Sequence, residues 1–137
     1  MRRSYMEKTL VLIKPDAVER KLIGKIITLY EERDLKVAAM RMLHADPEIV
    51  MRHYEEHIGR SYFDHLMNYI TRSPLVALVL QGENAIALAR EINGKTDPAE
   101  AAEGTIRRLY GQTKTYNTVH ASDSTESAAR EIEIWFS

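Results

Sequence analysis

Short apolar runs, each ended by proline or polar residues, predict the strands of this chain. Residues 10–13 form one such run, and Pro15 ends it. Residues 75–80 are apolar throughout, which is typical of a strand that is buried on both faces and central in its sheet. Residues 35–44 predict a further strand, and a short fourth strand is expected at 119–120.

Apolar residues at helical spacing, together with typical helix starts, predict the helices. They are expected at residues 22–33, 47–56, 62–70, 84–92 and 124–135. The second starts with a proline directly after an aspartate. The fourth starts at an asparagine that can cap a helix and ends at an Asn-Gly pair. The last follows Asp-Ser-Thr-Glu, in which a carboxylate lies three residues after a cap-like acceptor.

The elements follow one another as strand, helix, strand, two helices, strand, helix, strand and helix. This order predicts an α+β fold whose sheet is covered by helices on one face or both, but it does not determine the strand order. Residues 95–116 are only weakly periodic, and a loop of this length is usually functional or disordered. The length predicts one domain, residues 1–137, in which residues 1–6 are a candidate for a disordered extension.

Composition and charge exclude several classes of function. Lys and Arg number 19 and Asp and Glu number 20, so the near-zero net charge gives no reason to expect a nucleic acid or membrane partner. No apolar run has the length of a membrane span, and no signal-peptide core follows the basic first residues, so a cytoplasmic protein is expected. The absence of cysteine excludes disulfide bonds and a thiolate nucleophile.

The segment from Asn117 to Ser124 is the strongest candidate for catalytic chemistry. It places His120 at the end of the fourth strand, just before the last helix, where the ring can face a cleft. A neutral imidazole is nucleophilic at physiological pH and is one of the few side chains that can accept a phosphoryl group. Without further context, a structural histidine is the more common interpretation.

Four other side chains suit an anionic ligand. Lys14 ends a buried strand, Arg90 lies late in a helix, and Thr96 and Arg107 lie in the long loop. Arginine can make paired hydrogen bonds to phosphate oxygens, whereas lysine offers a compact charge. Taken singly, each is more often a solvated surface residue. A charge that ends an apolar run, as Lys14 does, nevertheless needs a reason.

The sequence Gly94-Lys95-Thr96 is similar to the end of a phosphate-binding P-loop. That motif requires a glycine five residues before its Gly-Lys pair, directly after a strand. This chain has Ala89 at that position, inside a predicted helix. A P-loop is therefore excluded, and any nucleotide must be bound in another way.

Several collinear segments together resemble one protein family. They are residues 9–17 (TLVLIKPDA), 53–57 (HYEEH), 82–85 (GENA), 96–102 (TDPAEAA), 104–107 (GTIR), 117–123 (NTVHASD) and 126–132 (ESAAREI). In order and spacing they are similar to nucleoside diphosphate kinase, over about residues 7–136. The resemblance implies a ferredoxin-like four-stranded antiparallel sheet covered by helices. Residues 95–116 would then form a long protruding loop before the last strand.

The resemblance also implies an activity. It is transfer of the γ-phosphate from a nucleoside triphosphate to a nucleoside diphosphate by a ping-pong mechanism, with His120 carrying the phosphate as phosphohistidine. Mg²⁺ would arrive with the nucleotide phosphates, because no cluster of acidic metal ligands is visible. Broad base specificity is expected, since ring stacking discriminates little between bases. The family further implies a homo-oligomer, with the long loop at the contact between subunits.

Roles for single residues follow from the same resemblance. The catalytic set that it implies is His120, Glu131, Lys14 and Tyr54. The nucleotide-binding set that it implies is Lys14, Tyr62, Arg90, Thr96, Arg107, Asn117 and His57. Tyr62 lies where the family commonly has a phenylalanine that stacks on the base, and Glu131 would orient His120.

Each of these roles has a plainer alternative in the sequence alone. Tyr54 would otherwise be a helix-face aromatic and Asn117 a loop cap. His57 would be a solvated residue at a helix end, and Glu131 a helix-surface glutamate. The remaining histidines are interpreted as structural or surface residues: His44, His53 and His65.

Three departures from the family pattern bear on these expectations. Residues 108–110 are Arg-Leu-Tyr where the family usually has Gly-Asp-Phe, which puts the conformation of the loop tip in doubt. Ala121 replaces a common glycine and disfavours a positive φ there. The chain ends at Ser137 without the tail that some members extend onto a neighbouring subunit, so the number of subunits stays open.

Two other classes of function compete with phosphotransfer. A catalytically silent nucleotide-binding protein of the same fold would be favoured by loss of the histidine, but His120 is present with its partners. A ferredoxin-like RNA-binding module is disfavoured by the near-zero net charge and by the lack of paired exposed aromatic residues on a strand. Phosphotransfer through His120 is therefore the function that the sequence favours.

Overall fold

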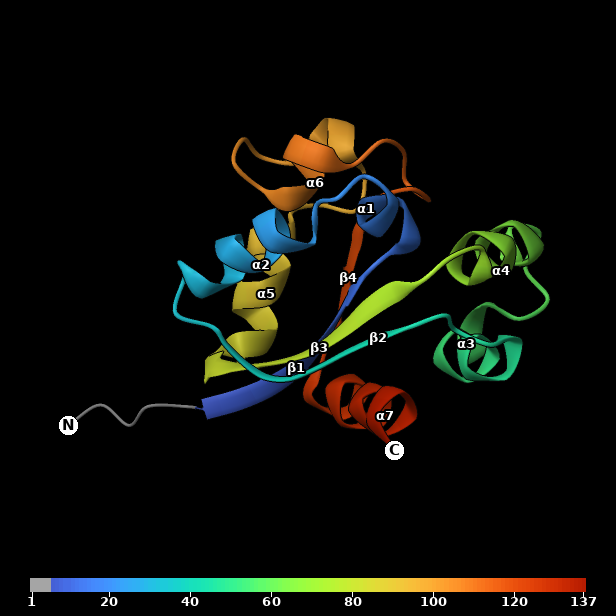
Figure 1. Cartoon of the computed structure of the whole chain (residues 1–137), viewed down its shortest axis with the longest axis horizontal. Helices are drawn as coiled ribbons and strands as arrows, with labels where there is room; N and C mark the ends of the chain where they lie inside the picture. The colour runs from blue at the N-terminus through green and yellow to red at the C-terminus, as the bar shows by residue number, and fades with distance from the viewer. Residues whose placement is uncertain (1–5) are drawn as a thin grey trace.

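Four strands form an antiparallel sheet at the centre of the molecule (Figure 1). The computed structural model describes residues 6–137. The strands are β1 (Met6–Ile13), β2 (Lys36–Leu43), β3 (Leu75–Glu83) and β4 (Val119–Ala121), in the order β2-β3-β1-β4. The prediction of a four-stranded antiparallel sheet with β3 in a central position is confirmed.

β1 is longer than its apolar run predicted. It begins at Met6, which pairs with Glu83 of β3, and its first residues are exposed or half-buried. Glu7 and Lys8 carry no hydrophobic signal, and Met6 is 59% exposed, so pairing with β3 rather than burial holds these positions in the strand. The prediction of a disordered extension over residues 1–6 is therefore wrong at Met6, and residues 1–5 lie outside the described part of the chain.

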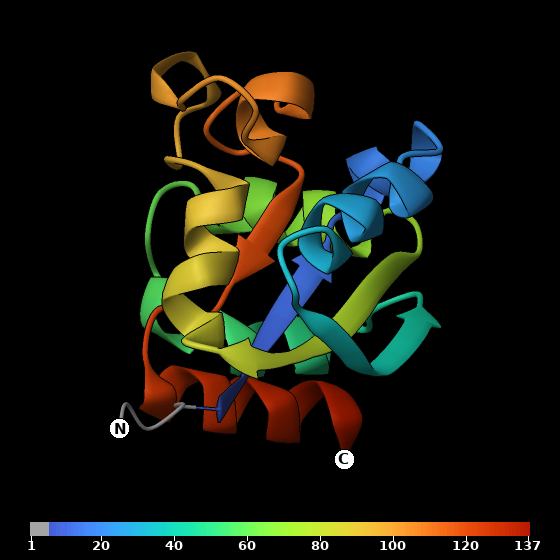
Figure 2. The same cartoon turned by 90° about the vertical axis from the view of Figure 1, so that its left-hand side faces the viewer.

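Helices cover both faces of the sheet (Figures 1 and 2). One hydrophobic core lies between the sheet and helices α2 (Ile23–Glu31) and α5 (Ala85–Asn93). A second core lies between the sheet and helices α3 (Pro47–His53), α4 (Phe63–Thr71) and α7 (Thr125–Phe136). The helices contribute their apolar stripes to these two cores, as the helical spacing of their hydrophobic residues predicted.

The side chains of β1 divide between these two cores. Val11 and Ile13 pack in the core with α2 and α5, whereas Leu10 and Leu12 pack in the core with α3 and α7. All four are fully buried, so an unbroken apolar run replaces the alternation of a half-exposed strand. The strand pairs Ile13 with Val119 of β4, which brings Lys14 beside the start of β4.

Three helical features differ from the sequence prediction. The short helix α1 (Pro15–Glu19) was missed, because its proline was interpreted only as the end of a strand, although proline also suits a first helical turn. The predicted helix over 47–56 breaks before its end, and the 3₁₀ turn η1 (Glu55–His57) follows. Asn84 precedes α5 as expected, but in the left-handed conformation, with φ 52° and no capping hydrogen bond from its side chain.

Residues 95–116 protrude at one end of the fold, at the top of Figure 2, but they are not structureless. They contain the 3₁₀ turn η2 (Pro98–Glu100) and the helix α6 (Ile106–Tyr110). Ile106 is fully buried and packs in the same core as α5, so it anchors the segment to the body of the domain.

The Arg-Leu-Tyr stretch at 108–110 forms the second half of α6 rather than a loop tip. Thr105 caps this helix by accepting a hydrogen bond from the backbone N–H of Arg108. The guanidinium of Arg20 donates a 2.6 Å hydrogen bond to the carbonyl of Tyr110. The unusual residues are therefore accommodated by local capping and by one contact with the chain after α1.

Candidate active site

A cleft of about 460 Å³ opens beside the paired ends of β1 and β4. Its lining comes from segments that are far apart in the sequence. It is lined by Lys14, Tyr54, His57, Tyr62, Leu66, Arg90, Asn93, Thr96, Arg107, Lys114, Thr115, Asn117, His120, Ala121 and Asp123. Every residue that the sequence predicted as catalytic or nucleotide-binding is in this set except Glu131, which contacts His120 from α7. The fold thus gathers the predicted residues at one place.

His120 has one ring nitrogen bound and the other free. Its Nε2 lies 2.6 Å from Oε1 of Glu131, and the same oxygen accepts a 2.8 Å hydrogen bond from the hydroxyl of Ser122. Glu131 is buried, so its carboxylate needs such donors. An imidazole that donates to a carboxylate through Nε2 keeps its lone pair on Nδ1. Within residues 6–137, no hydrogen bond involves Nδ1 of His120, so this nitrogen is available to react.

Lys14 is the buried cation of the cleft. Its Nζ donates a 2.8 Å hydrogen bond to Oδ1 of Asn117, whose Nδ2 donates to the carbonyls of Lys114 and Thr96. Burial, and after it the nearby charge of Arg107, lowers the pKa of Lys14 from 10.5 to about 7. Without a bound anion, the amine is therefore only partly charged at neutral pH.

Arg107 joins the long loop to the sheet. Its Nη1 donates a 2.7 Å hydrogen bond to the carbonyl of Gly94, and its Nη2 donates a 2.8 Å hydrogen bond to the carbonyl of Val119. The sequence predicted a guanidinium that binds phosphate, and here part of its donor capacity holds the backbone instead. An arginine side chain has five N–H groups, so donors remain for a ligand.

Three buried polar atoms in the cleft lining lack a hydrogen-bond partner. They are Oη of Tyr54, Nδ2 of Asn93 and Nε of Arg107. In the rest of residues 6–137, only the hydroxyl of Thr9 is in this state. A buried polar group without a partner costs about 1–3 kcal/mol, so each such group calls for an explanation. Their concentration around this cleft indicates a site that a polar ligand completes.

Tyr62 and His57 lie at the solvent-exposed part of the cleft. Tyr62 is 46% exposed, and its hydroxyl is hydrogen-bonded to Nδ1 of His57. The two rings lie edge to face, with centroids 5.6 Å apart. An exposed aromatic ring at the side of a cleft offers a flat surface on which a base can stack.

The charge of the lining favours an anionic ligand. Four basic residues contribute to it, and Asp123 is its single carboxylate. The sequence interpretation used Asp123 only as part of a helix start and therefore missed its place in the cleft. Hydrogen bonding from neighbouring serine side chains lowers the pKa of Asp123, and the nearby charge of Arg90 acts in the same direction. Asp123 is therefore ionised at neutral pH.

His53 is a second residue whose position the sequence interpretation did not foresee. It was grouped with the structural or surface histidines, but it is buried directly behind His120, with ring centroids 4.6 Å apart. The other two histidines of that group, His44 and His65, are exposed. In the sequence, the one feature that distinguishes His53 from these two histidines is its place beside Tyr54 in a segment that resembles the family.

Ala121 shows that no glycine is required after His120. In the described chain, the residues other than glycine with positive φ are Lys21, Asp34, Asn84 and Thr118. Because Ala121 is not among them, an alanine side chain is compatible with the backbone at this point of the cleft.

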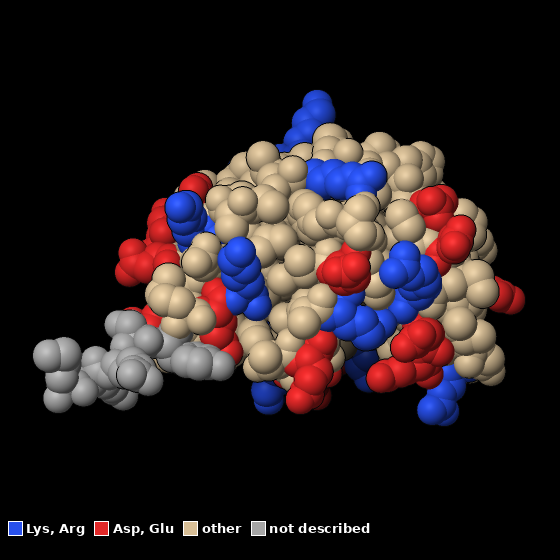
Figure 3. Space-filling model, turned by 90° about the horizontal axis from the view of Figure 1, so that it is seen from below, with Lys and Arg blue, Asp and Glu red and all other residues tan. Residues whose placement is uncertain are grey.

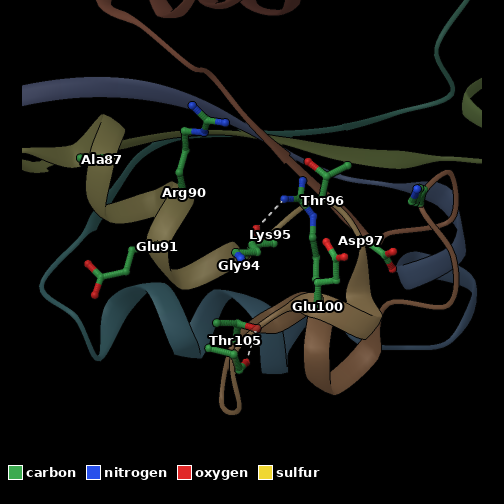
Figure 4. Close-up of a pocket in the computed structure, with 12 residues that line it drawn as sticks. Ala87, Arg90, Glu91, Gly94, Lys95, Thr96, Asp97, Glu100 and Thr105 are labelled. Atoms are coloured by element: carbon green, nitrogen blue, oxygen red, sulfur yellow. Dashed lines mark hydrogen bonds between the residues drawn. The ribbon is translucent and has the colours of Figure 1, made fainter.

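A larger cavity of about 1100 Å³ adjoins the cleft (Figure 4). It shares four residues with the cleft: Arg90, Thr96, Arg107 and Lys114. Its carboxylates come from Glu91, Asp97 and Glu100. In Figure 4, Arg90 and Glu91 leave α5 in different directions. Because its charges are mixed and His120 is not in its lining, the smaller cleft is the better place for an anion that reacts with histidine.

Comparison with known proteins agrees with this site. The family model described as nucleoside diphosphate kinase matches residues 7–137. The nucleoside diphosphate kinase of Clostridium perfringens is 56% identical over 131 residues, which cover 96% of this chain and 92% of that protein. That of Cutibacterium acnes is 54% identical over 130 residues, which cover 95% of this chain and 94% of that protein.

Solved structures give the same result for the fold. The nucleoside diphosphate kinase of Aquifex aeolicus matches with a TM-score of 0.94 and 40% identity, covering 97% of this chain and 96% of that chain. That of Encephalitozoon cuniculi matches with a TM-score of 0.93 and 35% identity, covering 95% of this chain and 88% of that chain.

The fold, the basic cleft and these similarities define an enzyme that transfers phosphate between nucleotides. The chain belongs to the nucleoside diphosphate kinase family. The family, the fold and the class of activity predicted from the sequence are therefore confirmed. No helix within residues 6–137 has both the length and the apolar character that crossing a bilayer requires.

Proposed function

We propose that the enzyme transfers the γ-phosphate of a nucleoside triphosphate to a nucleoside diphosphate in two half-reactions through His120. In the first, the lone pair of Nδ1 attacks the γ-phosphorus, an N–P bond forms, and the bond to the bridging oxygen breaks with its electrons on the departing diphosphate. In the second, a terminal oxygen of another diphosphate attacks the phosphorus and the electron pair returns to Nδ1. The observation that carries this proposal is the 2.6 Å contact between Nε2 and Glu131, which leaves Nδ1 unprotonated.

Glu131 orients the imidazole and stabilises its charge. While phosphorus is bound to Nδ1, the ring becomes more positive, and the carboxylate that accepts from Nε2–H opposes that charge. Ser122 donates to the same oxygen and keeps the carboxylate in place. Neither residue needs to contact the nucleotide to have this effect.

The basic residues neutralise the phosphates during transfer. Phosphoryl transfer requires mainly positioning and stabilisation of charge on the phosphate oxygens. Lys14, Arg90 and Arg107, which all line the cleft, supply that charge. The partnerless hydroxyl of Tyr54 is in position to donate to a phosphate oxygen, so Tyr54 joins the proposed catalytic set.

Thr96 and Asn117 complete the proposed nucleotide-binding set. Both line the cleft, and Asn117 already links Lys14 to the long loop through its amide. Tyr62 is the proposed stacking surface for the base, with His57 beside it. Stacking on one exposed ring accepts any base, so broad base specificity is part of the proposal.

Mg²⁺ is the proposed cofactor, carried by the nucleotide. It prefers oxygen ligands, retains several waters and commonly binds through one or two carboxylates together with substrate phosphates. The lining fits this pattern, because Asp123 is its single carboxylate and is ionised at neutral pH. Asp123, together with the phosphates, would hold the ion. When bound, Mg²⁺ adds positive charge at the phosphate oxygens.

Self-association as a homo-oligomer is also proposed. β2 is an edge strand, and Met40 and Met42 on it are 61% and 57% exposed. An edge strand with exposed apolar side chains is a template for pairing with another chain. The protruding residues 95–116 offer a second contact surface. We further propose a cytoplasmic location, which cell fractionation would test.

Light scattering at micromolar concentration tests the assembly. The unaltered protein should have at least twice the monomer mass, and the double variant Met40→Lys, Met42→Lys should lower it. Met51→Lys is the matched control, because Met51 is also exposed but lies on α3 rather than on the edge strand. A stable monomer mass for the unaltered protein would contradict the proposal.

Labelling with γ-³²P ATP tests the mechanism. We expect one acid-labile, base-stable phosphate per subunit, which chases onto added GDP as GTP. His120→Ala should fold, because the side chain is partly exposed, but should neither label nor turn over. Label that persists in His120→Ala would exclude His120 as the phosphate carrier.

A further inference from the structure

A buried histidine and a buried tryptophan lie behind His120. Trp135 of α7 donates a 3.0 Å hydrogen bond from Nε1 to Nδ1 of His53, the last residue of α3. Trp135 is fully buried and His53 nearly so. The proposed mechanism assigns no role to either residue. Their contact nevertheless joins the two helices directly beneath the reacting imidazole.

The tryptophan determines which nitrogen of His53 carries the proton. An indole N–H can only donate, so Nδ1 of His53 must accept and the ring hydrogen must be on Nε2. Burial lowers the pKa of His53 well below 6.5, and the neighbouring basic groups His120, Arg130, Lys14 and His57 act in the same direction. The ring is therefore a neutral imidazole of one tautomer.

The rings of His53 and His120 meet edge to face. Their centroids are 4.6 Å apart at an interplanar angle of 80°. A second edge-to-face contact joins His53 to Tyr54, with centroids 4.4 Å apart. His120 is thus bounded by Glu131 at Nε2 and by the ring of His53. These contacts restrict rotation of the imidazole about its side-chain bonds.

The same residues resemble a metal site, but the tautomer argues against one. Each of His53, His120 and Glu131 offers one ligand atom, and these three atoms lie within 4.8 Å of one another. A metal-bound histidine needs a free lone pair on the coordinating nitrogen. In His53, Nδ1 accepts from Trp135 and Nε2 carries the hydrogen, so neither nitrogen has one to offer.

We infer that His53, held by Trp135 as the neutral Nε2–H tautomer, is a positioning residue that orients the imidazole of His120 for phosphoryl transfer. The inference rests on the proposed role of His120. Ring rotation would carry Nδ1 away from the line of attack, and misplacement of a reacting group by about 1 Å can cost a factor of 100 in rate. Because His53 does not line the cleft, its loss should leave nucleotide binding intact.

Two variants separate positioning from packing. His53→Asn keeps an acceptor oxygen near the place of Nδ1, so Trp135 retains a partner, but it removes the ring that faces His120. Trp135→Phe keeps an aromatic ring and removes only the N–H that selects the tautomer. His65→Asn is the matched control, because His65 is exposed and lies outside the cleft lining.

Three quantities are measured for each variant. They are the rate of a single-turnover phosphorylation with labelled ATP, the affinity for ATP, and the final amount of phosphate bound per subunit. His53→Asn should phosphorylate about 10 to 100 times more slowly, with affinity within twofold of the unaltered protein and full final labelling. Trp135→Phe should slow the step by about 10-fold, and His65→Asn should not change it. Full labelling at a reduced rate identifies positioning, whereas a packing defect lowers the folded fraction and the final labelling together.

Nitrogen NMR of the histidine rings provides a readout that does not depend on activity. The ring of His53 should show hydrogen on Nε2 and an unprotonated Nδ1 from pH 5 to pH 8. Titration of His53 within that range, or an unchanged phosphorylation rate in His53→Asn, would overturn the inference. If His53→Asn fails to fold, the phosphorylation rate of Trp135→Phe is used instead, and an unchanged rate in that variant would overturn the inference. Lack of labelling in the unaltered protein would instead refute the proposed mechanism and leave the tautomer result unaffected.

Discussion

The lowered pKa of Lys14 predicts that nucleotide binding takes up a proton. In the free protein, burial holds the pKa of this amine at about 7. A bound polyphosphate places negative charge beside Nζ and raises the pKa toward its ordinary value of 10.5. The amine is then fully charged in the complex, and the proton that completes its charge comes from solvent.

The size of the effect follows from the pKa. With a value near 7, the Lys14 amine is about 90% charged at pH 6, about 50% at pH 7 and about 10% at pH 8. Binding should therefore take up about 0.1, 0.5 and 0.9 proton per site at these three pH values. By linkage, nucleotide affinity should fall as pH rises above 7, with a limit of about tenfold per pH unit.

Titration calorimetry measures this uptake directly. Binding of ADP is followed at pH 6, 7 and 8, each in two buffers with different ionisation enthalpies, and excess Mg²⁺ keeps the phosphates ionised. Lys14→Arg is the control, because arginine is charged throughout this range and has no proton to take up. Proton uptake that does not change with pH, or that persists in Lys14→Arg, would refute the assignment to Lys14.

Three further predictions concern other parts of the site and fold. Glu131→Gln should slow phosphorylation, measured by single-turnover labelling, by about 10 to 100-fold, and should leave ADP affinity, measured by calorimetry, unchanged. An equal loss of rate and affinity would place Glu131 in the binding site. Tyr62→Ala should weaken binding of GDP, CDP, UDP and dTDP to a similar extent, and a preference above about a thousandfold in steady-state rates would reveal a contact that reads the base edge. Gly94→Ala should lower the free energy of unfolding by about 1–3 kcal/mol, because φ there is 87° and a Cβ atom would lie 2.6 Å from Oγ1 of Thr105. Chemical denaturation measures this change, and Gly24→Ala is the control, since a Cβ atom there meets nothing within 4 Å and alanine favours the helix. Equal destabilisation of both variants would contradict the reasoning.

The sequence by itself determined the features that depend on spacing along the chain. Apolar periodicity located four strands and the helices that pack on them, since a residue's place in a strand or helix decides which face it occupies. Local chemistry located helix ends such as Asp46, which accepts from the N–H of Ile49, and Gly94, which follows α5 with φ 87°. The collinear segments identified the family, and every site residue predicted from that resemblance except Glu131 lines the cleft.

Where the sequence prediction was wrong, strand pairing or packing against residues distant in the sequence decided the local structure. The exposed start of β1 is a strand because it pairs with β3, not because its side chains are buried. Asn84 takes a positive φ at the junction of β3 and α5 rather than capping the helix with its side chain. Residues 95–116 gain helix α6 because Ile106 is buried in the core, which their weak periodicity did not reveal.

Only the tertiary structure decided the chemical state of the site. Lys14 and Asn117 are 103 residues apart and His53 and Trp135 are 82 apart, yet each pair is hydrogen-bonded in the interior. The pKa of Lys14 and the tautomer of His53 follow from these contacts and from burial, because the free energy of a charge or a hydrogen bond depends on the groups and solvent around it. A sequence specifies which titratable groups exist. Their protonation is determined by the fold that brings distant neighbours against them and removes water.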